Sequence, residues 1–203
     1  EQGVFHVVGL FMEREPALDK NQSAQEIIDG IHEVGGLAVL AHPAWSLNTP
    51  EMIMQLHDID ATEIYNTVSE KGQSFRADSS IIVDMLASRG LNLPLLATDD
   101  AHMYDGIDNG IAYIMAECET NSPDDIKRAI LEKRFYASQG PEIKEIYVED
   151  GKLFVNTSDA ARITIVTGIR RAASAHSKDG VPVNSLSFGV EDNMKYVRVV
   201  VTD

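Results

Sequence analysis

The stretch that decides the fold is GLAVLAHP at positions 36–43. Its apolar part, residues 37–41, has the length and composition of a strand that is buried on both faces of a parallel sheet. Pro43 follows directly on His42, and a proline restricts the residue before it to an extended backbone. The stretch therefore predicts a buried strand that ends in a histidine with a fixed exit from the sheet.

Helix and strand patterns alternate on both sides of this stretch, over the first 135 or so residues. Ser23 and Glu26 form the capping-box pattern of a helix start, and Thr49-Pro50 pairs a cap with a proline at the first helical position. Apolar spacing predicts a longer helix over residues 74–89, and Ser122 opens a last helix with an acidic first turn. The predicted strands cover residues 4–11, 37–41, 61–65, 93–97 and 111–117. This alternation is typical of parallel βαβ units, so we predict an α/β fold.

The sequence pattern changes after Phe135, from alternating helices and strands to strands alone. Residues 143–149 and 152–157 flank Asp150-Gly151, which predicts a β-hairpin with a two-residue turn. Residues 162–167 and 196–202 are further strand candidates. We therefore predict an α/β domain over residues 1–138 and a small, all-β C-terminal domain over residues 139–203.

Charge and cysteine content exclude several classes of function. The chain has 17 Lys and Arg against 32 Asp and Glu, a net charge of −15, which repels nucleic acid and anionic membranes. A single cysteine, Cys118, excludes an internal disulfide framework and a multi-cysteine zinc site, and it fits a reducing compartment. The apolar runs are too short to span a bilayer, and the start lacks a signal-peptide pattern. We expect a cytoplasmic protein that acts on neither nucleic acid nor membranes.

No Gly-x-Gly-x-x-Gly, P-loop or Gly-x-Ser-x-Gly pattern occurs in the sequence. The candidate functional residues are instead histidines and carboxylates that lie in or directly after predicted strands. These side chains are His6, His42, Glu63, Asp99, Asp100 and His102. Asp100 and His102 are two apart, so on an extended segment they point to one side. Imidazole with carboxylate is a ligand set for Zn²⁺, Mn²⁺ or Fe²⁺, and strand ends converge on one face of a parallel barrel. Taken singly, each residue more often has a structural role, as a core histidine, part of a turn or a solvated carboxylate, so the prediction rests on their combination.

The sequence resembles the PHP family, the polymerase and histidinol phosphatase class of metal-dependent phosphoesterases. The similar segments are residues 5–10, 36–43, 62–66 and 97–102. Residues 135–141, followed by a β-rich tail, resemble the carbaryl-hydrolase-like branch of that family. The family's opening His-x-His strand has no counterpart before His6, so we expect a member that lacks the N-terminal part and roughly half of the ligands.

The resemblance implies a partial, distorted (β/α)₇ barrel with divalent metal ions, Mn, Zn or Fe, at its C-terminal mouth. His6, His42, Glu63, Asp100 and His102 then occupy ligand positions, with Asp100 and His102 as catalytic residues. Arg76 and Lys71 are weaker candidates for contacts with substrate oxygens. The implied reaction is hydrolysis of a small phosphorylated substrate by metal-activated water.

Four interpretations stay open at this point. The chain is an active phosphoesterase, a non-catalytic module that binds a metal or an anion, an α/β domain with structural histidines, or an amidohydrolase-like metal hydrolase. Missing first strands would also expose sheet edges, so a homo-oligomer is possible.

Overall fold

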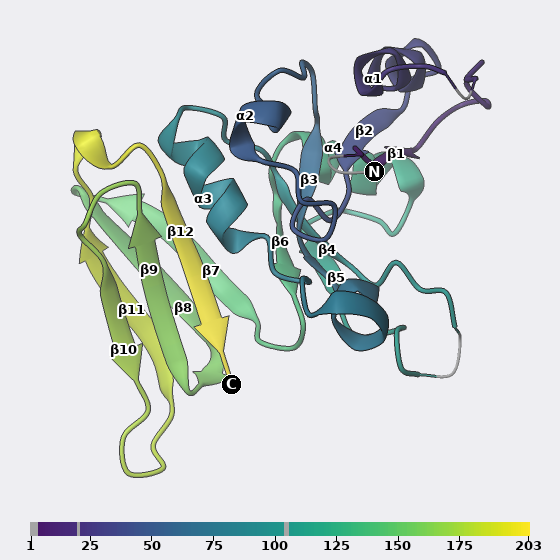
Figure 1. Ribbon diagram of the computed structural model, residues 1–203. Coiled ribbons are helices and arrows are strands. Elements are labelled where there is room, and N and C mark those ends of the chain that lie inside the picture. The colour runs from purple at the N-terminus through teal and green to yellow at the C-terminus, as the bar shows by residue number, and fades with distance from the viewer. Residues whose placement is uncertain (1–3, 20, 104–105) are drawn as a thin grey trace. The chain divides into compact units, whose positions relative to one another are not determined.

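The computed structural model describes residues 4–19, 21–103 and 106–203, without the side chains of residues 71–73. The chain forms two compact units, residues 1–86 with 91–139, and residues 87–90 with 140–203 (Figure 1). Each unit is described by itself below. No helix in the described ranges is long and apolar enough to cross a bilayer.

The first part of the chain holds the mixed α/β elements. In chain order these are β1 (Val7–Leu10), α1 (Ala24–Glu33), β2 (Leu37–Leu40), α2 (Pro50–Ile53), β3 (Ala61–Asn66), the π-helical turn η1 (Ser69–Ser74), α3 (Ser80–Ser88), β4 (Leu95–Thr98), β5 (Tyr113–Ala116), α4 (Pro123–Leu131) and β6 (Phe135–Ser138). The predicted α/β class is confirmed. Strands β1 and β5 are shorter than predicted at both ends, whereas β3 and β4 each extend one residue past the predicted end.

A four-stranded sheet in the order β1-β2-β3-β4 carries the first unit. Strands β2, β3 and β4 are parallel, as predicted, and β2 is buried along its whole length. Strand β1 runs antiparallel to β2, with Val7 opposite Leu40. Strands β5 and β6 pair with each other in a separate, antiparallel sheet. The larger sheet is open within the described residues, so the partial (β/α)₇ barrel remains a prediction.

The antiparallel direction of β1 determines which of its ends lies beside the carboxyl ends of the neighbouring strands. The carboxyl ends of β2, β3 and β4 share one edge of the sheet because these strands are parallel. The amino end of β1 lies at that same edge, where the Ala41 amide donates to the His6 carbonyl at 3.0 Å. His6 therefore meets the residues that follow β2, which a parallel β1 would not allow.

The helix that precedes β2 begins as the sequence predicts. The Glu26 amide donates to Ser23 Oγ at 3.3 Å, and the Ser23 amide donates to Glu26 Oε2 at 2.8 Å, which completes the capping box. Ile28 and Ile31 pack from this helix against Ala38 of β2. The cap therefore fixes the start of a helix that covers one face of the sheet.

Replacing Ser23 by alanine is expected to lower the free energy of unfolding by about 1 kcal/mol, because the helix loses its capping acceptor. Urea denaturation followed by circular dichroism measures this change. Ser185→Ala, at an exposed strand position, is the control and should change the stability by less than about 0.5 kcal/mol. Equal effects of the two substitutions would contradict the capping role.

The helix predicted over residues 74–89 is shorter in the structure, where α3 covers only Ser80–Ser88. Phe75 has a φ of 56°, a left-handed conformation that interrupts a helix. The residues after it pair with the end of β3, where the Asn66 amide donates to the Ala77 carbonyl at 3.2 Å. Tertiary hydrogen bonds therefore override the helical pattern of this segment.

The second part of the chain is made of strands. They are β7 (Ile143–Glu149), β8 (Lys152–Ala160), β9 (Arg162–Thr167), β10 (Ala173–His176), β11 (Val183–Gly189) and β12 (Val197–Thr202), with a 3-10 turn, η2 (Asp192–Met194). The predicted hairpin is confirmed, since Glu149 pairs with Lys152 and the turn residues Asp150 and Gly151 have φ values of 47° and 71°. These two positive φ angles are typical of a type I′ turn.

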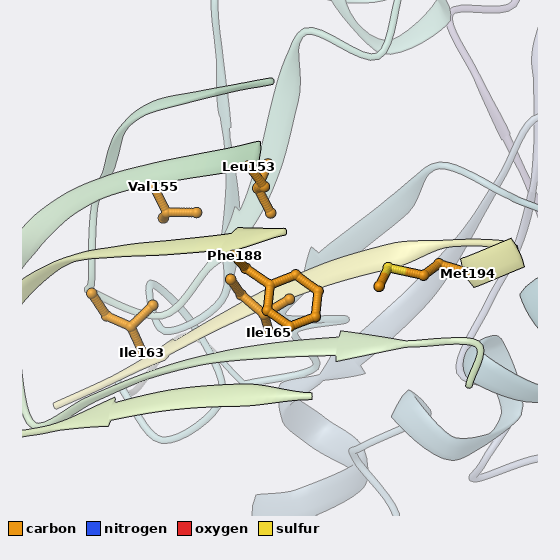
Figure 2. Close-up of a cluster of buried hydrophobic side chains, with 6 residues drawn as sticks. All are labelled: Leu153, Val155, Ile163, Ile165, Phe188 and Met194. Carbon is orange, nitrogen blue, oxygen red and sulfur yellow. The ribbon is translucent and has the colours of Figure 1, made fainter. Parts of the chain in front are cut away.

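Two three-stranded sheets, β11-β8-β7 and β10-β9-β12, share the core of this unit. Alternate residues of β8 and β9 are buried, as expected for strands with one face toward a core. Figure 2 shows the resulting cluster, which consists of Leu153, Val155, Ile163, Ile165, Phe188 and Met194.

Candidate functional site

Polar side chains collect at the edge of the sheet where β2, β3 and β4 end and β1 begins. His6 precedes β1, His42 follows β2, Asn66 ends β3, and Asp99 and Asp100 follow β4. Three of these positions were predicted from the sequence as ligand positions. The sheet topology therefore brings together residues that are far apart in the chain.

His42 has a backbone that differs from the prediction. Its φ is 27°, so the expected extended conformation before Pro43 is wrong. The His42 amide donates to Glu63 Oε2 at 2.7 Å, and this buried hydrogen bond holds the unusual backbone. The ring is nearly buried, and Nδ1 lies 3.1 Å from Ser46 Oγ. Left-handed backbones of this kind cluster at functional sites because the surroundings must compensate for the strain.

The imidazole of His6 lies against that of His42. Their ring centroids are 4.8 Å apart, with an interplanar angle of 73°. Burial, followed by the charge of His42, lowers the pKa of His6 below its ordinary value, although Asp100 acts in the opposite direction. His6 is therefore neutral near pH 7, so one ring nitrogen keeps the lone pair that a metal ligand needs.

Asp100 approaches the same imidazole. Its Oδ2 lies 3.8 Å from His42 Nε2, and 38% of its side chain is exposed. The φ of Asp100 is 50°, so the extended segment predicted for Asp100 and His102 is wrong. The carboxylate lies between the buried His42 and solvent, a position from which it can contact a bound ion or substrate.

Glu63 is held from several sides. Oε1 accepts from Thr98 Oγ1 at 2.6 Å, and Oε2 accepts from the His42 amide at 2.7 Å and from Asn66 Nδ2 at 2.9 Å. Only 5% of Glu63 is exposed. Both oxygens therefore accept hydrogen bonds from protein donors, and these bonds link the ends of β2, β3 and β4.

His102 lies at the exposed side of the cluster. Its Nδ1 is 2.6 Å from the Asp100 carbonyl, which can only accept, so Nδ1 carries the proton. In the neutral ring this leaves the lone pair on Nε2. The His102 amide donates to Asp108 Oδ2 at 2.8 Å. These contacts tie His102 to its own loop, while the His42 ring lies against His6 and its Nε2 faces Asp100.

His6, His42 and Asp100 have the kinds of ligand atom that transition-metal cations bind, but their arrangement does not form a complete metal site. Metal–ligand bonds of about 2.0–2.2 Å place two ligand atoms of one ion roughly 3–4 Å apart, and the 3.8 Å between His42 and Asp100 lies in that range. No group of three or more His, Cys, Asp or Glu in the described ranges is arranged to hold a metal ion. The cluster therefore matches a cation site in its ligand types only.

One predicted substrate-binding residue lies beside the cluster. Arg76 Nη1 donates to the Trp45 carbonyl at 3.3 Å, and the Trp45 ring packs 5.1 Å from His42 and 5.6 Å from His6, centroid to centroid. The side chain of Lys71, the other candidate, lies outside the described residues.

Sequence reasoning gave no role to several residues that organise the site, namely Trp45, Asn66, Thr98 and Asp108. Asn66 is fully buried, and its Nδ2 donates both to Glu63 and, at 3.3 Å, to Asp100. Their positions in the chain could have indicated a role, because Asn66 ends the strand that contains Glu63 and Thr98 ends the strand before Asp100. Trp45, the single tryptophan, lies three residues after His42.

The hydrogen bonds of Asp99 predict a loss of stability in acid. Burial by itself raises the pKa of this carboxyl, but hydrogen bonds from the Ala112 amide, the Thr67 hydroxyl and neighbouring amides bring the pKa below its ordinary value. The stabilising contribution is therefore complete above the pKa of the unfolded chain and is lost as the pH falls through the lower, folded-state value.

We expect the stability difference between the wild type and Asp99→Asn to be smaller at about pH 3 than at about pH 7. Urea denaturation at the two pH values measures it. An equal difference at both would contradict the role given to the ionised carboxylate.

Comparison with known proteins gives one informative similarity. The sequence matches no family profile and no curated protein. A solved structure from Bacteroides vulgatus ATCC 8482, a two-domain protein containing a predicted PHP-like metal-dependent phosphoesterase, aligns with a TM-score of 0.52 at 13% identity. The alignment covers 97% of this chain and 61% of that chain. This chain shares the fold of that PHP-like protein. At this identity the similarity concerns the fold alone, and the chain spans less than two thirds of the protein that it matches.

Proposed function

We propose that this chain is a PHP-like, metal-dependent phosphoesterase of the carbaryl-hydrolase-like branch, built on part of a (β/α)₇ barrel. The observation that carries the proposal is the meeting of His6, His42 and Asp100 at one edge of the sheet, with His42 Nε2 3.8 Å from Asp100 Oδ2. The fold shared with a predicted phosphoesterase supports the same reading.

In this proposal His6, His42, Asp100 and His102 hold a divalent cation, Mn²⁺, Zn²⁺ or Fe²⁺. When bound, such an ion lowers the pKa of a water molecule and neutralises phosphoryl oxygens. The lowered pKa of His6 favours its neutral form, and the hydrogen bond from His102 Nδ1 to the Asp100 carbonyl leaves Nε2 as the nitrogen that can bind the cation. Glu63, proposed as a ligand from the sequence, orients the His42 backbone in the described arrangement.

Asp100 and His102 are the proposed catalytic residues. Asp100 is half-exposed beside buried His42, so its carboxylate can accept a hydrogen bond from water or orient it toward a substrate. The Arg76 guanidinium, held on the Trp45 carbonyl, is the proposed partner of substrate oxygens. The net charge of −15 favours a small phosphorylated substrate over nucleic acid. A single cysteine is compatible with the reducing cytoplasm that we propose as its compartment.

Hydrolysis of p-nitrophenyl phosphate and bis(p-nitrophenyl) phosphate by the purified chain, with Mn²⁺, Zn²⁺ or Fe²⁺, tests the proposal. We expect turnover that requires the cation and disappears with a chelator. Turnover of p-nitroacetanilide without phosphoester hydrolysis would instead support an amidohydrolase-like enzyme and contradict the phosphoesterase.

A non-catalytic binding module is the second candidate. It is favoured by the incomplete cluster of ligands in the described ranges and by the engagement of both Glu63 oxygens with protein donors. This candidate predicts binding of Mn²⁺ or phosphate by calorimetry without turnover of any of these substrates.

A further inference from the structure

Two consecutive aspartates at the end of β4 have opposite surroundings. Asp100 is an exposed residue whose carboxylate faces His42. The Asp99 carboxylate accepts from the Thr67 hydroxyl and the Ala112 amide, both at 2.8 Å, and from the amides of Gly110 and Ile111. The first carboxylate of the pair is therefore saturated by the protein, and the second is available to a ligand.

The contacts of Asp99 join three segments around the site. Thr67 follows β3, and Gly110 to Ala112 lead into β5, so one carboxylate connects both segments to the end of β4. The Val68 amide also donates to the Asp99 carbonyl at 3.1 Å. The backbone on the amino side of Asp100 is consequently fixed by its main chain and by its side chain.

A second carboxylate fixes the backbone on the other side of Asp100. Asp108 is only 3% exposed, and its Oδ2 accepts from the His102 amide at 2.8 Å and from the Met103 amide at 3.0 Å. Asp100 thus lies between two anchored stretches of chain. Its left-handed φ of 50° costs conformational energy, which these hydrogen bonds compensate.

We propose that Asp99, with Asp108 as the second anchor, is a positioning residue that aims the Asp100 carboxylate at His42. The inference rests on the proposed function, because it assigns Asp99 to the support of the cation site rather than to contact with the cation. Loss of a hydrogen-bonding residue that supports a metal ligand typically lowers metal affinity about 10–100-fold. A purely structural role of Asp99 would instead lower stability and leave the affinity of the folded protein unchanged.

Mn²⁺ binding followed by electron paramagnetic resonance tests the inference in the full chain. Asp99→Asn keeps one acceptor oxygen but removes the charge, and we expect it to weaken Mn²⁺ binding at least about 10-fold while the circular dichroism spectrum stays folded. We also expect the visible absorption of bound Co²⁺ to change, because the geometry of Asp100 changes. If Asp99→Asn does not fold, Thr67→Val removes one donor to the same carboxylate and should weaken binding in the same direction.

Asp60→Asn is the matched control. Asp60 also accepts from a backbone amide, that of Ala38 at 2.7 Å, but it precedes β3 at the opposite edge of the sheet. It should lower stability without changing the Mn²⁺ affinity. If the wild type binds Mn²⁺ and Asp99→Asn or Thr67→Val binds it equally well, the positioning inference is overturned and the proposed function stands. If the wild type binds no Mn²⁺, the proposed function fails, and the inference that rests on it fails with it.

Discussion

Replacing His42 by alanine is expected to abolish both Mn²⁺ binding and phosphoester hydrolysis, with a loss of more than about 100-fold in each. His42 is the shared neighbour of the proposed ligands, since its ring contacts His6 and its Nε2 faces Asp100. Even supporting residues of a metal site contribute about 10–100-fold to affinity, so the loss of a direct ligand should exceed that range. Calorimetric titration with Mn²⁺ and initial rates with p-nitrophenyl phosphate measure the two effects.

His57→Ala is the control for this substitution. His57 is an exposed histidine in the same unit, and its amide donates to Gln25 Oε1 at 2.8 Å, a bond that the substitution keeps. We expect affinity and rate within about two-fold of the wild type, since surface substitutions of this kind are usually neutral. Equal behaviour of the two alanine variants would remove His42 from the site.

Replacing Glu63 by alanine is expected to lower the free energy of unfolding by about 3–5 kcal/mol. The substitution removes the acceptor of the buried His42 amide and of the Thr98 hydroxyl and one of the two acceptors of Asn66 Nδ2, and each unsatisfied buried donor costs about 1–3 kcal/mol. A cavity at the meeting point of three strands adds to the loss. Urea denaturation gives the value from the shift in the midpoint.

Glu145→Ala provides a matched comparison, because Glu145 also accepts from an asparagine, Asn156 Nδ2 at 2.8 Å, but on the surface. This substitution should cost less than about 0.5 kcal/mol. A loss below about 1 kcal/mol for Glu63→Ala would show that the buried carboxylate does not brace the sheet.

Local patterns with a direct physical cause could be predicted from the sequence. The capping box at Ser23 satisfies donors within the same turn, and the Asp150-Gly151 turn needs only two positive φ angles. The apolar run before His42 specifies a strand buried on both faces. These features depend on neighbours in the chain, so the sequence contains the information that determines them.

Features set by distant contacts were missed. Strand β1 is antiparallel to β2, although its apolar pattern alone is equally consistent with both directions. The helix start at residue 74 was wrong because Ala77 and Ser79 bond to β3 instead. Strands β10 and β11 were not predicted, since polar residues such as Ser174, Asn184 and Ser185 fill their exposed positions and hide the apolar alternation.

The candidate site was predictable in its ligand types and less so in its geometry. Strand ends identified His42 and Asp100, which the structure brings to 3.8 Å from each other. The left-handed backbones of both residues were not predictable, because they depend on a carboxylate from β3 and on the donors around Asp99. For the same reason the sequence did not separate Glu63, which binds protein donors, from Asp100, which faces solvent.

Anomalous diffraction from crystals of the full chain soaked in Mn²⁺ tests the central claim most directly. The proposal predicts a strong anomalous peak within coordination distance, about 2.0–2.4 Å, of side-chain atoms from at least two of His6, His42 and Asp100. A peak that lies only elsewhere, or no peak at a concentration that saturates other Mn²⁺ proteins, would contradict it.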